Sequence, residues 1–163
     1  MKLRFAREED AAALLKIYAQ YINTPVTFET SLPSAEEFRA RIGRISRFYP
    51  YLLAVENGEI AGYAYASPWQ ERPAYVWGAE LSVYVGESMR SRGVGSALYG
   101  AMLELLRLQG VRTVYAVVTV PNMRSEALHR KFDFRAAAVF RNAGYKGGWR
   151  AVCWFEKRLA PCN

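Results

Sequence analysis

Short stretches rich in β-branched and aromatic residues recur along this chain, and in several of them apolar and polar positions alternate. Both features are typical of β-strands, in which successive side chains point to opposite faces. The pattern predicts strands at residues 2–6, 51–56, 59–67, 80–85, 112–120, 134–140 and 151–157. Asn57-Gly58 separates the second and third strands and predicts a type I′ hairpin turn, because both residues tolerate a positive φ.

Other stretches show the spacing of an amphipathic helix. The longest covers residues 93–109, and its apolar residues recur at intervals of four and three: Val94, Leu98, Ala101, Leu105 and Leu108. Acidic residues from Glu8 onward open an earlier helix, which we expect Pro25 to break. A capping box at Ser34 starts the second helix, and Asn122 is a favourable N-cap for the last.

The predicted elements follow the order β-α-α-β-β-β-α-β-α-β-β, without an internal repeat, a low-complexity stretch or a linker. We therefore predict one domain over residues 1–163, an α/β (α+β) fold with a mixed sheet and helices on both faces. A chain of 163 residues is long enough to bury a sizeable core.

The lack of targeting signals and the pattern of cysteines both predict an ordinary intracellular protein. No apolar run approaches the ~20 residues that span a bilayer, and the N-terminus turns polar at Arg7 without a signal-peptide core. The two cysteines, Cys153 and Cys162, form neither a disulfide framework nor a metal-binding spacing. We expect a cytoplasmic protein with no membrane partner and no metal site.

The formal net charge is +7, and most of the positive charge comes from arginine. Nucleic-acid binding is one interpretation of a basic chain. The arginines are dispersed rather than gathered in a block, however, so we expect no nucleic-acid partner. A basic surface also attracts a polyanionic cofactor, and this is the interpretation that the next motif favours.

The strand at 80–85 is followed by a polar run and then by residues 90–96, which open the longest helix. The first N–H groups of a helix have no internal partner, so such a position favours an anion. Gly93 and Gly95 let a phosphate approach the backbone, and flanking arginines add positive charge. The Lys-Ser/Thr pair of a P-loop is missing, and Leu98 replaces the third glycine of the dinucleotide fingerprint. An ordinary turn with surface arginines is the alternative.

Motifs spread through nearly the whole chain resemble those of one family. They are Thr27-Phe28-Glu29, Gly62–Ala66, Glu80–Val85, Arg90–Ser96, Asn122, Leu128-His129 and Gly144-Tyr145-Lys146. The loop at 90–96 has the Arg-x-x-Gly-x-Gly pattern that binds the pyrophosphate of acetyl-coenzyme A in the GCN5-related N-acetyltransferases (GNAT). The sequence resembles this family, and within it the phosphinothricin and methionine sulfoximine/sulfone N-acetyltransferases.

The resemblance implies the GNAT fold, a mixed, mostly antiparallel twisted sheet of about seven strands flanked by four helices. It implies direct transfer of acetyl from acetyl-coenzyme A to the primary amine of a small molecule, such as an amino acid or an analogue. Relatives often form homodimers. In the family the strand at 80–85 bulges and splays away from the strand at 112–120, and the pantetheine arm lies in the gap.

Two catalytic side chains follow from the resemblance. Glu80 is the implied general base, since an ammonium must lose a proton before it attacks and burial raises the pKa of a carboxyl. The alternative is a carboxylate paired with an arginine or exposed at an edge. His129, the only histidine, takes the position of the general acid for the thiolate, and a structural hydrogen-bonding role is its alternative. Backbone N–H groups around Val83 are the implied oxyanion donors.

The implied cofactor-binding residues lie on the central strand, in the phosphate loop and at the start of the last helix: Val83, Tyr84, Val85, Arg90, Ser91, Arg92, Gly93, Val94, Gly95, Ser96, Asn122 and Ser125. The acceptor pocket is expected to draw on Phe28, Glu29, Arg72, Tyr75 and Tyr145. Arg72 would face an acceptor carboxylate. For the aromatic residues, packing into the core is the alternative, and for Asn122 it is a plain N-cap.

The chain departs from the family pattern in two places. Asp133 stands where relatives have glycine, and we expect it to adopt the αL conformation, which Asp tolerates. The loop at residues 145–150 is shorter than in relatives, which puts the acceptor in doubt more than the cofactor. Peptide N-termini, polyamines or another xenobiotic are alternative acceptors, and a non-catalytic acyl-coenzyme A-binding domain is the alternative function.

Overall fold

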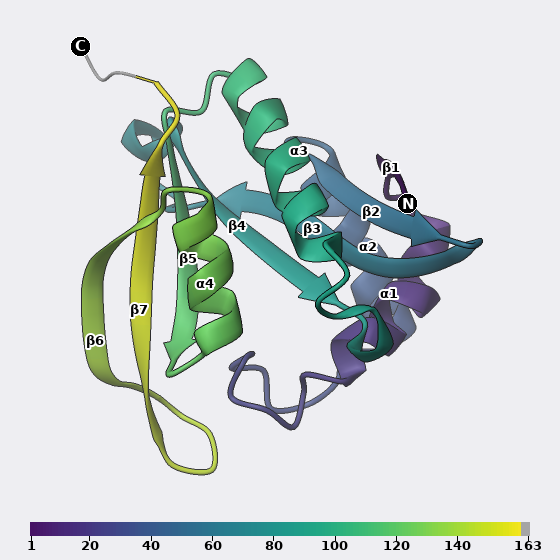
Figure 1. The fold of residues 1–163 in the computed structure, drawn as a ribbon, viewed down its shortest axis with the longest axis horizontal. Helices are drawn as coiled ribbons and strands as arrows, with labels where there is room; N and C mark the ends of the chain where they lie inside the picture. Colours follow the sequence, from purple (N-terminus) through teal and green to yellow (C-terminus); the bar gives the residue numbers. More distant parts are fainter. Residues whose placement is uncertain (161–163) are drawn as a thin grey trace.

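Seven strands form one twisted sheet in the order β1-β2-β3-β4-β5-β7-β6 (Figure 1). The computed structural model describes residues 1–160. The strands are β1 Lys2–Phe5, β2 Tyr51–Glu56, β3 Glu59–Pro68, β4 Gly78–Val85, β5 Thr113–Val120, β6 Arg135–Tyr145 and β7 Trp149–Arg158. Neighbouring strands are antiparallel except β4 and β5, which are parallel. The predicted mixed, mostly antiparallel sheet is confirmed.

Two pairs of helices cover the two faces of the sheet. They are α1 Ala11–Ala19, α2 Ala35–Ser46, α3 Val94–Leu108 and α4 Met123–Lys131. In Figure 1, α3 and α4 lie in front of the sheet and α1 and α2 lie behind it. Short 3-10 helices at Glu8–Asp10, Pro73–Tyr75 and Glu87–Met89 join some of these elements. The order of strands and helices is the one that the sequence predicts.

A hydrophobic core lies on each face of the sheet. On β4, Leu81 and Val83 belong to the front core, which α3 covers, and Tyr84 belongs to the back core of α1 and α2. Side chains two positions apart on a strand share a face, so Glu80 and Ser82 also point to the back. The predicted general base therefore lies on the face of α1 and α2.

Helix cover on the back face is incomplete. The helices α1 and α2 pack against β2, β3 and β4. None of the four α-helices lies behind β5, β7 and β6 (Figure 1). Val117 and Phe140, whose register partners Trp154 and Val152 share the back face of β7, are exposed there. This part of the sheet therefore leaves apolar surface open to a partner.

Local sequence signals place the turns and caps where they are predicted. Asn57 and Gly58 have φ of 52° and 84°, as a type I′ turn requires. The side chains of Ser34 and Asn122 accept backbone N–H groups and cap α2 and α4. Asp133 adopts the αL conformation with a φ of 58°. These signals act within a few residues, which is why the sequence alone reveals them.

Two predicted boundaries are wrong. The first helix ends at Ala19 rather than at Pro25, and turns fill the interval. The strand predicted at 134–140 continues to Tyr145. A shift in the β6–β7 register, with Asn142 at a φ of 53°, lets the pairing resume after the irregularity. The β6–β7 loop is consequently only residues 146–148.

Candidate active site

The strands β4 and β5 share a short parallel pairing and then part. They pair only over Gly78–Glu80 and Thr113–Tyr115. Beyond these residues β4 continues along β3 as far as Val85, and β5 continues along β7 as far as Val120. The predicted splay is confirmed, but the predicted bulge in β4 is wrong. The register of β4 against β3 runs without a shift, so the gap opens because β5 follows β7 instead.

Main-chain polar groups of β4 face this gap. The N–H of Gly86 donates to the carbonyl of Ala61 at 2.9 Å, which fixes the phase of the antiparallel ladder. The alternation of such a ladder then turns the N–H and C=O of Val83 and Val85 away from β3. The Tyr21 hydroxyl satisfies Val85: it donates to the carbonyl at 2.6 Å and accepts the N–H at 3.3 Å. Val83 keeps its main-chain groups directed at the gap.

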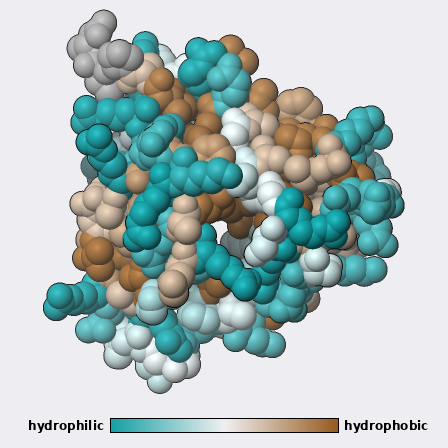
Figure 2. Space-filling view, viewed as in Figure 1, coloured by the Kyte–Doolittle hydropathy of each residue, from teal (hydrophilic) through white to brown (hydrophobic). Residues whose placement is uncertain are grey.

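The gap contains a slot with a volume of about 70 Å³. Five of the predicted site residues line it: Val83, Tyr84, Asn122, Ser125 and His129. Tyr99, which the sequence did not indicate, is among the other residues of the lining. Figure 2 shows the front face hollowed near its centre, with hydrophilic side chains around the opening. The structure thus brings β4, α3 and α4 together around one cavity.

His129 and Tyr99 form a buried hydrogen-bonded pair in the wall of the slot. Nδ1 of His129 lies 2.6 Å from the carbonyl of Ser125, which can only accept, so Nδ1 carries the proton. Burial lowers the pKa of His129, and the Ser125 carbonyl offsets part of this effect. In the neutral ring Nε2 accepts, and the Tyr99 hydroxyl donates to it at 2.7 Å. These are the bonds of the structural alternative, and the role of His129 as general acid stays a prediction.

The predicted phosphate loop leads into the N-terminus of α3. Gly93 has a φ of 83° and Ser91 a φ of 61°, a backbone course that raises the cost of a side chain at position 93. The guanidinium of Arg90 lies 5.2 Å from the centre of the Tyr21 ring. Arg92 pairs with a carboxylate of the β2–β3 hairpin at 3.2 Å. Both arginines are therefore held beside the first turn of α3.

A further cation at the phosphate loop comes from α4. Nζ of Lys131 donates to Oγ of Ser96 at 3.0 Å. This contact joins the last turn of α4 to the first turn of α3, across 35 residues of sequence. This contact could not be predicted from the sequence, since Lys131 becomes a neighbour of the loop only when the two helices pack.

Glu80 lies at the point where β4 and β5 part. Its neighbours across the sheet are Ser67 on β3 and Tyr115 on β5. Burial raises the pKa of the Glu80 carboxyl. Within residues 1–160 it belongs to none of the ion pairs, so the alternative of an arginine-paired carboxylate is wrong. A partly buried carboxyl of this kind holds a proton more strongly than usual, which suits a general base.

Part of the predicted acceptor pocket forms where the loop after α1 meets the β6–β7 hairpin. Nζ of Lys146 donates to the carbonyls of Thr27 and Glu29, each at 2.7 Å. The Phe28 ring lies so close to Gly144 that a Cβ there would come within 2.5 Å of it. Two chain segments more than 100 residues apart are thus tied together, and the tie holds the predicted acceptor residues Phe28 and Glu29 beside Tyr145.

The Glu29 carboxylate accepts hydrogen bonds from side chains of α1 and α2. Arg41 on α2 donates to it at 2.7 and 3.2 Å, and the Tyr18 hydroxyl donates to it as well. The Arg41 guanidinium is the main reason that the pKa of Glu29 is lowered. Tyr145 is largely exposed and packs edge-on against Trp149 at 5.6 Å. The acceptor-binding roles of Glu29 and Tyr145 stay predictions.

The remaining predicted acceptor residues, Arg72 and Tyr75, lie before β4. Arg72 is exposed and precedes the 3-10 helix Pro73–Tyr75. Tyr75 packs edge-on against Trp69 at 5.1 Å, and Trp69 stacks on Tyr115 at 4.0 Å. Since Tyr115 is the cross-strand neighbour of Glu80, this aromatic group adjoins the predicted base. The ring contacts therefore link Tyr75 to the strand pair at Glu80, and the acceptor-binding role of Arg72 stays a prediction.

The donor set of this chain fits acetyl-coenzyme A. The gap beside Val83 offers the unpaired edge of a strand to the amides of a pantetheine arm. The first turn of α3, with Gly93 in the αL conformation and basic side chains around it, offers N–H groups and positive charge to a pyrophosphate. At Gly95 a Cβ would have ordinary contacts, at 3.6 Å from Leu128 and 3.7 Å from Val85. That glycine stands at the mouth of the gap.

The match to a family model agrees with this geometry. Residues 3–156 match the acetyltransferase (GNAT) domain. The chain belongs to the GNAT acetyltransferases. It is therefore an N-acetyltransferase that uses acetyl-coenzyme A.

Curated and solved relatives cover nearly the whole of this GNAT chain. It is 38% identical to the phosphinothricin N-acetyltransferase of Streptomyces viridochromogenes, over 96% of this chain and 87% of that protein. It is 29% identical to the L-methionine sulfoximine/L-methionine sulfone acetyltransferase of Pseudomonas aeruginosa, over 98% and 95%. The structure of a phosphinothricin acetyltransferase from Sinorhizobium meliloti in complex with acetyl-coenzyme A superposes with a TM-score of 0.94. That protein is 31% identical, and the match covers 98% of this chain and 88% of that one.

The described part of this acetyltransferase has neither a metal-binding cluster nor a membrane-spanning helix. Among residues 1–160, no group of three or more His, Cys, Asp or Glu side chains is arranged to hold a metal ion. None of the described helices is long and apolar enough to cross a membrane. Cys153 is a buried free thiol, and Cys162 lies outside the described residues.

Proposed function

We propose that this acetyltransferase acetylates the amino group of phosphinothricin or of a close analogue such as methionine sulfoximine or methionine sulfone. The observation that carries the chemistry is Glu80, a partly buried carboxyl with a raised pKa at the opening of the β4–β5 gap. The choice of acceptor is supported by the names of the relatives from Streptomyces viridochromogenes and Pseudomonas aeruginosa.

Glu80 is the group that accepts the proton of the acceptor. An amine reaches the site as an ammonium ion at neutral pH and attacks only after it loses a proton. The carboxylate of Glu80 attracts the ammonium, and its raised pKa brings it closer to a useful basicity. A water molecule between Glu80 and the amine would complete the transfer. Glu80 then releases the proton to solvent.

Acetyl-coenzyme A supplies an acetyl group activated as a thioester. The main-chain N–H of Val83 faces the gap. We propose that it donates a hydrogen bond to the carbonyl oxygen of the thioester and stabilises the negative charge that develops there. The N–C bond forms as the C–S bond breaks. The ammonium group loses two protons in all: Glu80 takes one, and the other ends on the coenzyme A sulfur.

Tyr99 is our candidate for the contact with the departing sulfur. The one ring proton of neutral His129 is hydrogen-bonded to the Ser125 carbonyl, so in this proposal a proton reaches the sulfur through the Tyr99 hydroxyl. The Tyr99 hydroxyl lies in the wall of the same slot, and an O–H group can turn about its C–O bond toward a sulfur there. We therefore assign His129 the role of positioning Tyr99. Asn122 and Ser125, which also line the slot, would contact the pantetheine arm.

The acceptor is held from two sides in this proposal. Arg72 pairs with an anionic group of the acceptor, because its guanidinium is exposed near the aromatic group of Trp69 and Tyr75. Phe28, Glu29 and Tyr145 form the other side, where the loop after α1 meets the β6–β7 hairpin. The phosphate loop Arg90–Ser96 binds the pyrophosphate at the first turn of α3.

We further propose that the protein works as a homodimer in the cytoplasm. The exposed apolar residues on the back of β5 and β6, such as Val117 and Phe140, supply a surface for a second copy. A free thiol at Cys153 suits a reducing compartment. Sedimentation at several protein concentrations tests the dimer, and a single monomeric species at all of them would count against it.

Thiol release from acetyl-coenzyme A over a panel of amines tests the proposed function. The panel contains phosphinothricin, methionine sulfoximine, methionine sulfone, free amino acids, polyamines and short peptides. We expect the highest kcat/KM for the phosphinothricin and sulfone group. Turnover of polyamines or peptides alone would contradict the proposed acceptor. Binding of acetyl-coenzyme A without turnover of any amine would support a non-catalytic binding domain instead.

A further inference from the structure

The end of α1 is tied to the connection that leads from β4 to the phosphate loop. Oε1 of Gln20 accepts the N–H of Glu87 at 2.8 Å. The next residue is Tyr21, whose hydroxyl donates to the carbonyl of Val85 at 2.6 Å and accepts the N–H of the same residue at 3.3 Å. The guanidinium of Arg90 lies 5.2 Å from the centre of the Tyr21 ring. One aromatic side chain thus joins the tip of β4 to a cation of the phosphate loop.

Packing on the back face holds the Tyr21 ring in this position. The ring contacts Tyr84 edge-on, with the two ring centres 5.3 Å apart, and it packs against the back core of α1 and α2. Tyr84 in turn stacks on the buried ring of Tyr63 at 5.2 Å. The Tyr21 hydroxyl is therefore presented to Val85 by a ring that has neighbours on more than one side.

The Tyr21 hydroxyl occupies one of two equivalent positions on the open edge of β4. The main-chain groups of Val83 and Val85 both face the gap, and residues two apart on such a strand are separated by about 6.8 Å. The pantetheine arm of coenzyme A carries two amide groups, so an edge with both positions open would accept it in more than one register. Because Tyr21 engages both the N–H and the carbonyl of Val85, Val83 is the position of the two that stays open to the arm.

The register of the arm decides where the thioester lies. Glu80 lies where β4 and β5 part, on the side of Val83 that is away from the strand tip. An arm that bonds Val85 instead of Val83 is shifted toward the tip by about 6.8 Å. Reacting atoms must lie about 3–3.5 Å apart for the transfer to proceed, so a thioester shifted by that distance is bound but does not react.

We infer that Tyr21 is a positioning residue, which sets the register of the pantetheine arm by blocking the main-chain groups of Val85. It acts through the backbone of β4 and does not touch the reacting atoms. The inference rests on the proposed function, because Glu80 as the base defines which register is productive. It replaces the predicted contact of Val85 with the cofactor by a contact at Val83.

Amide hydrogen exchange, measured by NMR with and without coenzyme A, tests the register directly. In the wild type we expect coenzyme A to protect the N–H of Val83 and to leave that of Val85 unchanged. Tyr21→Phe keeps the ring beside Arg90 and removes only the hydroxyl, so coenzyme A should then protect both N–H groups. Protection gained at Val85 in the wild type, or at Val83 alone in the variant, would overturn the inference.

The kinetics of the same variant separate positioning from a purely structural role. A second, unreactive register binds acetyl-coenzyme A without turning it over. In Tyr21→Phe, kcat, the KM for acetyl-coenzyme A and the Kd for coenzyme A should therefore all fall about three- to tenfold, with kcat/KM unchanged. Weaker binding of coenzyme A together with a lower Tm would show that Tyr21 only stabilises the fold, and would overturn the inference.

Gln20→Ala is the matched control for the tie between α1 and the phosphate loop. It removes the neighbouring bond to Glu87 and leaves the Tyr21 hydroxyl on Val85, so neither kcat nor the Kd for coenzyme A should change. Equal effects of Gln20→Ala and Tyr21→Phe would overturn the inference, because loosening of the connection would then explain both.

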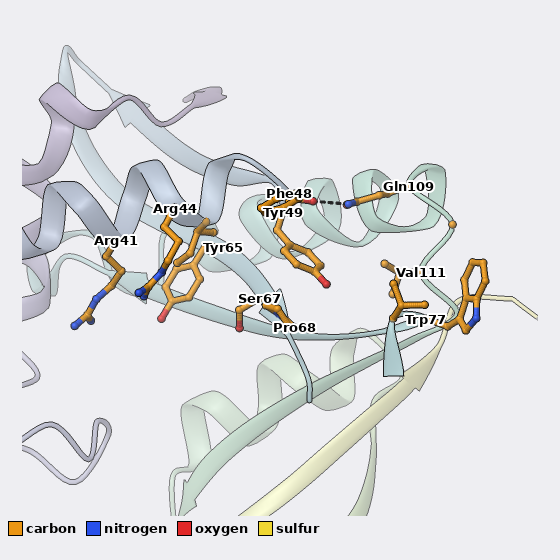
Figure 3. Close-up of a pocket in the computed structure, with 13 residues that line it drawn as sticks. Arg41, Arg44, Phe48, Tyr49, Tyr65, Ser67, Pro68, Trp77, Gln109 and Val111 are labelled. Atoms are coloured by element: carbon orange, nitrogen blue, oxygen red, sulfur yellow. Dashed lines mark hydrogen bonds between the residues drawn. The ribbon is translucent and has the colours of Figure 1, made fainter. Parts of the chain in front are cut away.

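A hydroxyl at the other end of β4 provides a second control. Tyr49 lines a groove of about 680 Å³ on the back face, with Arg44 at one end and Trp77 at the other (Figure 3). Trp77 directly precedes β4, whereas Val85 ends it. Tyr49→Phe should therefore change neither kcat nor the exchange at Val85. Turnover of no amine by the wild type would overturn the proposed function and the productive register with it, whereas the exchange pattern at Val85 tests the position of the arm by itself.

Discussion

The hydroxyl of Tyr99 lies 2.7 Å from Nε2 of His129, and both side chains line the slot between β4 and β5. The bond joins α3 to α4 across 30 residues of sequence. Since Nδ1 of the same ring lies 2.6 Å from the Ser125 carbonyl, the tautomer and orientation of His129 are fixed. The polar wall of the cofactor slot therefore depends on the packing of α3 against α4, which carry these two side chains.

Removal of the Tyr99 hydroxyl should affect turnover and stability together. In Tyr99→Phe, buried Nε2 loses its donor, so we expect the free energy of unfolding to fall by about 1–3 kcal/mol. We expect kcat to fall about tenfold, with the Kd for coenzyme A unchanged. Tyr63→Phe is the control, since the hydroxyl of Tyr63 is buried without a hydrogen-bond partner in the described part of the chain. Loss of stability with full kcat would show that the pair is structural only.

The tie between Lys146 and the loop after α1 should govern acceptor binding. Lys146→Met removes both hydrogen bonds to the Thr27 and Glu29 carbonyls, so the loop loses its anchor. We expect KM for the acceptor to rise severalfold, whereas KM for acetyl-coenzyme A stays the same. Lys157→Met, which breaks a contact with Asp133, is the matched control. An equal rise of both KM values in Lys146→Met would mean that the loop serves the whole site.

Substitutions of the two glycines of the phosphate loop should have different effects, one on stability and the other on cofactor binding. Gly93→Ala forces a side chain into a φ of 83°, which costs about 1–2 kcal/mol, so Tm should fall. At Gly95 an added Cβ has ordinary contacts and the φ is not positive, so the main effect expected of Gly95→Val is weaker acetyl-coenzyme A binding. Calorimetric titration and thermal melts of both variants separate the two effects. Unchanged binding in Gly95→Val would refute its place at the pyrophosphate.

Glu80 should lower the stability of the folded state at neutral pH. Its pKa is higher in the folded than in the unfolded chain, so the folded state binds more protons and stability falls as pH rises through that interval. Glu80→Gln carries no charge, so we expect it to have a higher Tm than the wild type at pH 7. The difference should vanish below the ordinary carboxyl pKa of 4.5. A lower Tm for the variant at pH 7 would mean that Glu80 has a stabilising partner.

The sequence predicts the features of this protein that arise within a few residues. The hairpin turn at Asn57-Gly58, the caps at Ser34 and Asn122, and the αL residue Asp133 follow from the conformational preferences of single side chains. The resemblance to the family likewise locates the β4–β5 gap. These signals suffice for the order of elements and for most residues around the slot.

Contacts between distant segments were not predictable in the same way. The bond of Tyr21 to Val85 spans 64 residues, and it exists only because α1 ends against the tip of β4. The pairing of Tyr99 with His129 and the groove beside Arg44 likewise depend on how helices pack on the sheet. The extension of β6 past residue 140 was missed because a register shift near Asn142 interrupts the alternation.

The most direct test of the account is the turnover of Glu80→Gln against its affinity for coenzyme A. At pH 7 we expect kcat with phosphinothricin to fall about 10²- to 10³-fold, because the base is lost, while the Kd for coenzyme A stays within about twofold. In the wild type, kcat/KM should rise with pH through the raised pKa of Glu80, and this limb should be absent in the variant. Unchanged kcat, or equal loss of turnover and coenzyme A binding, would contradict the role of Glu80 as the general base.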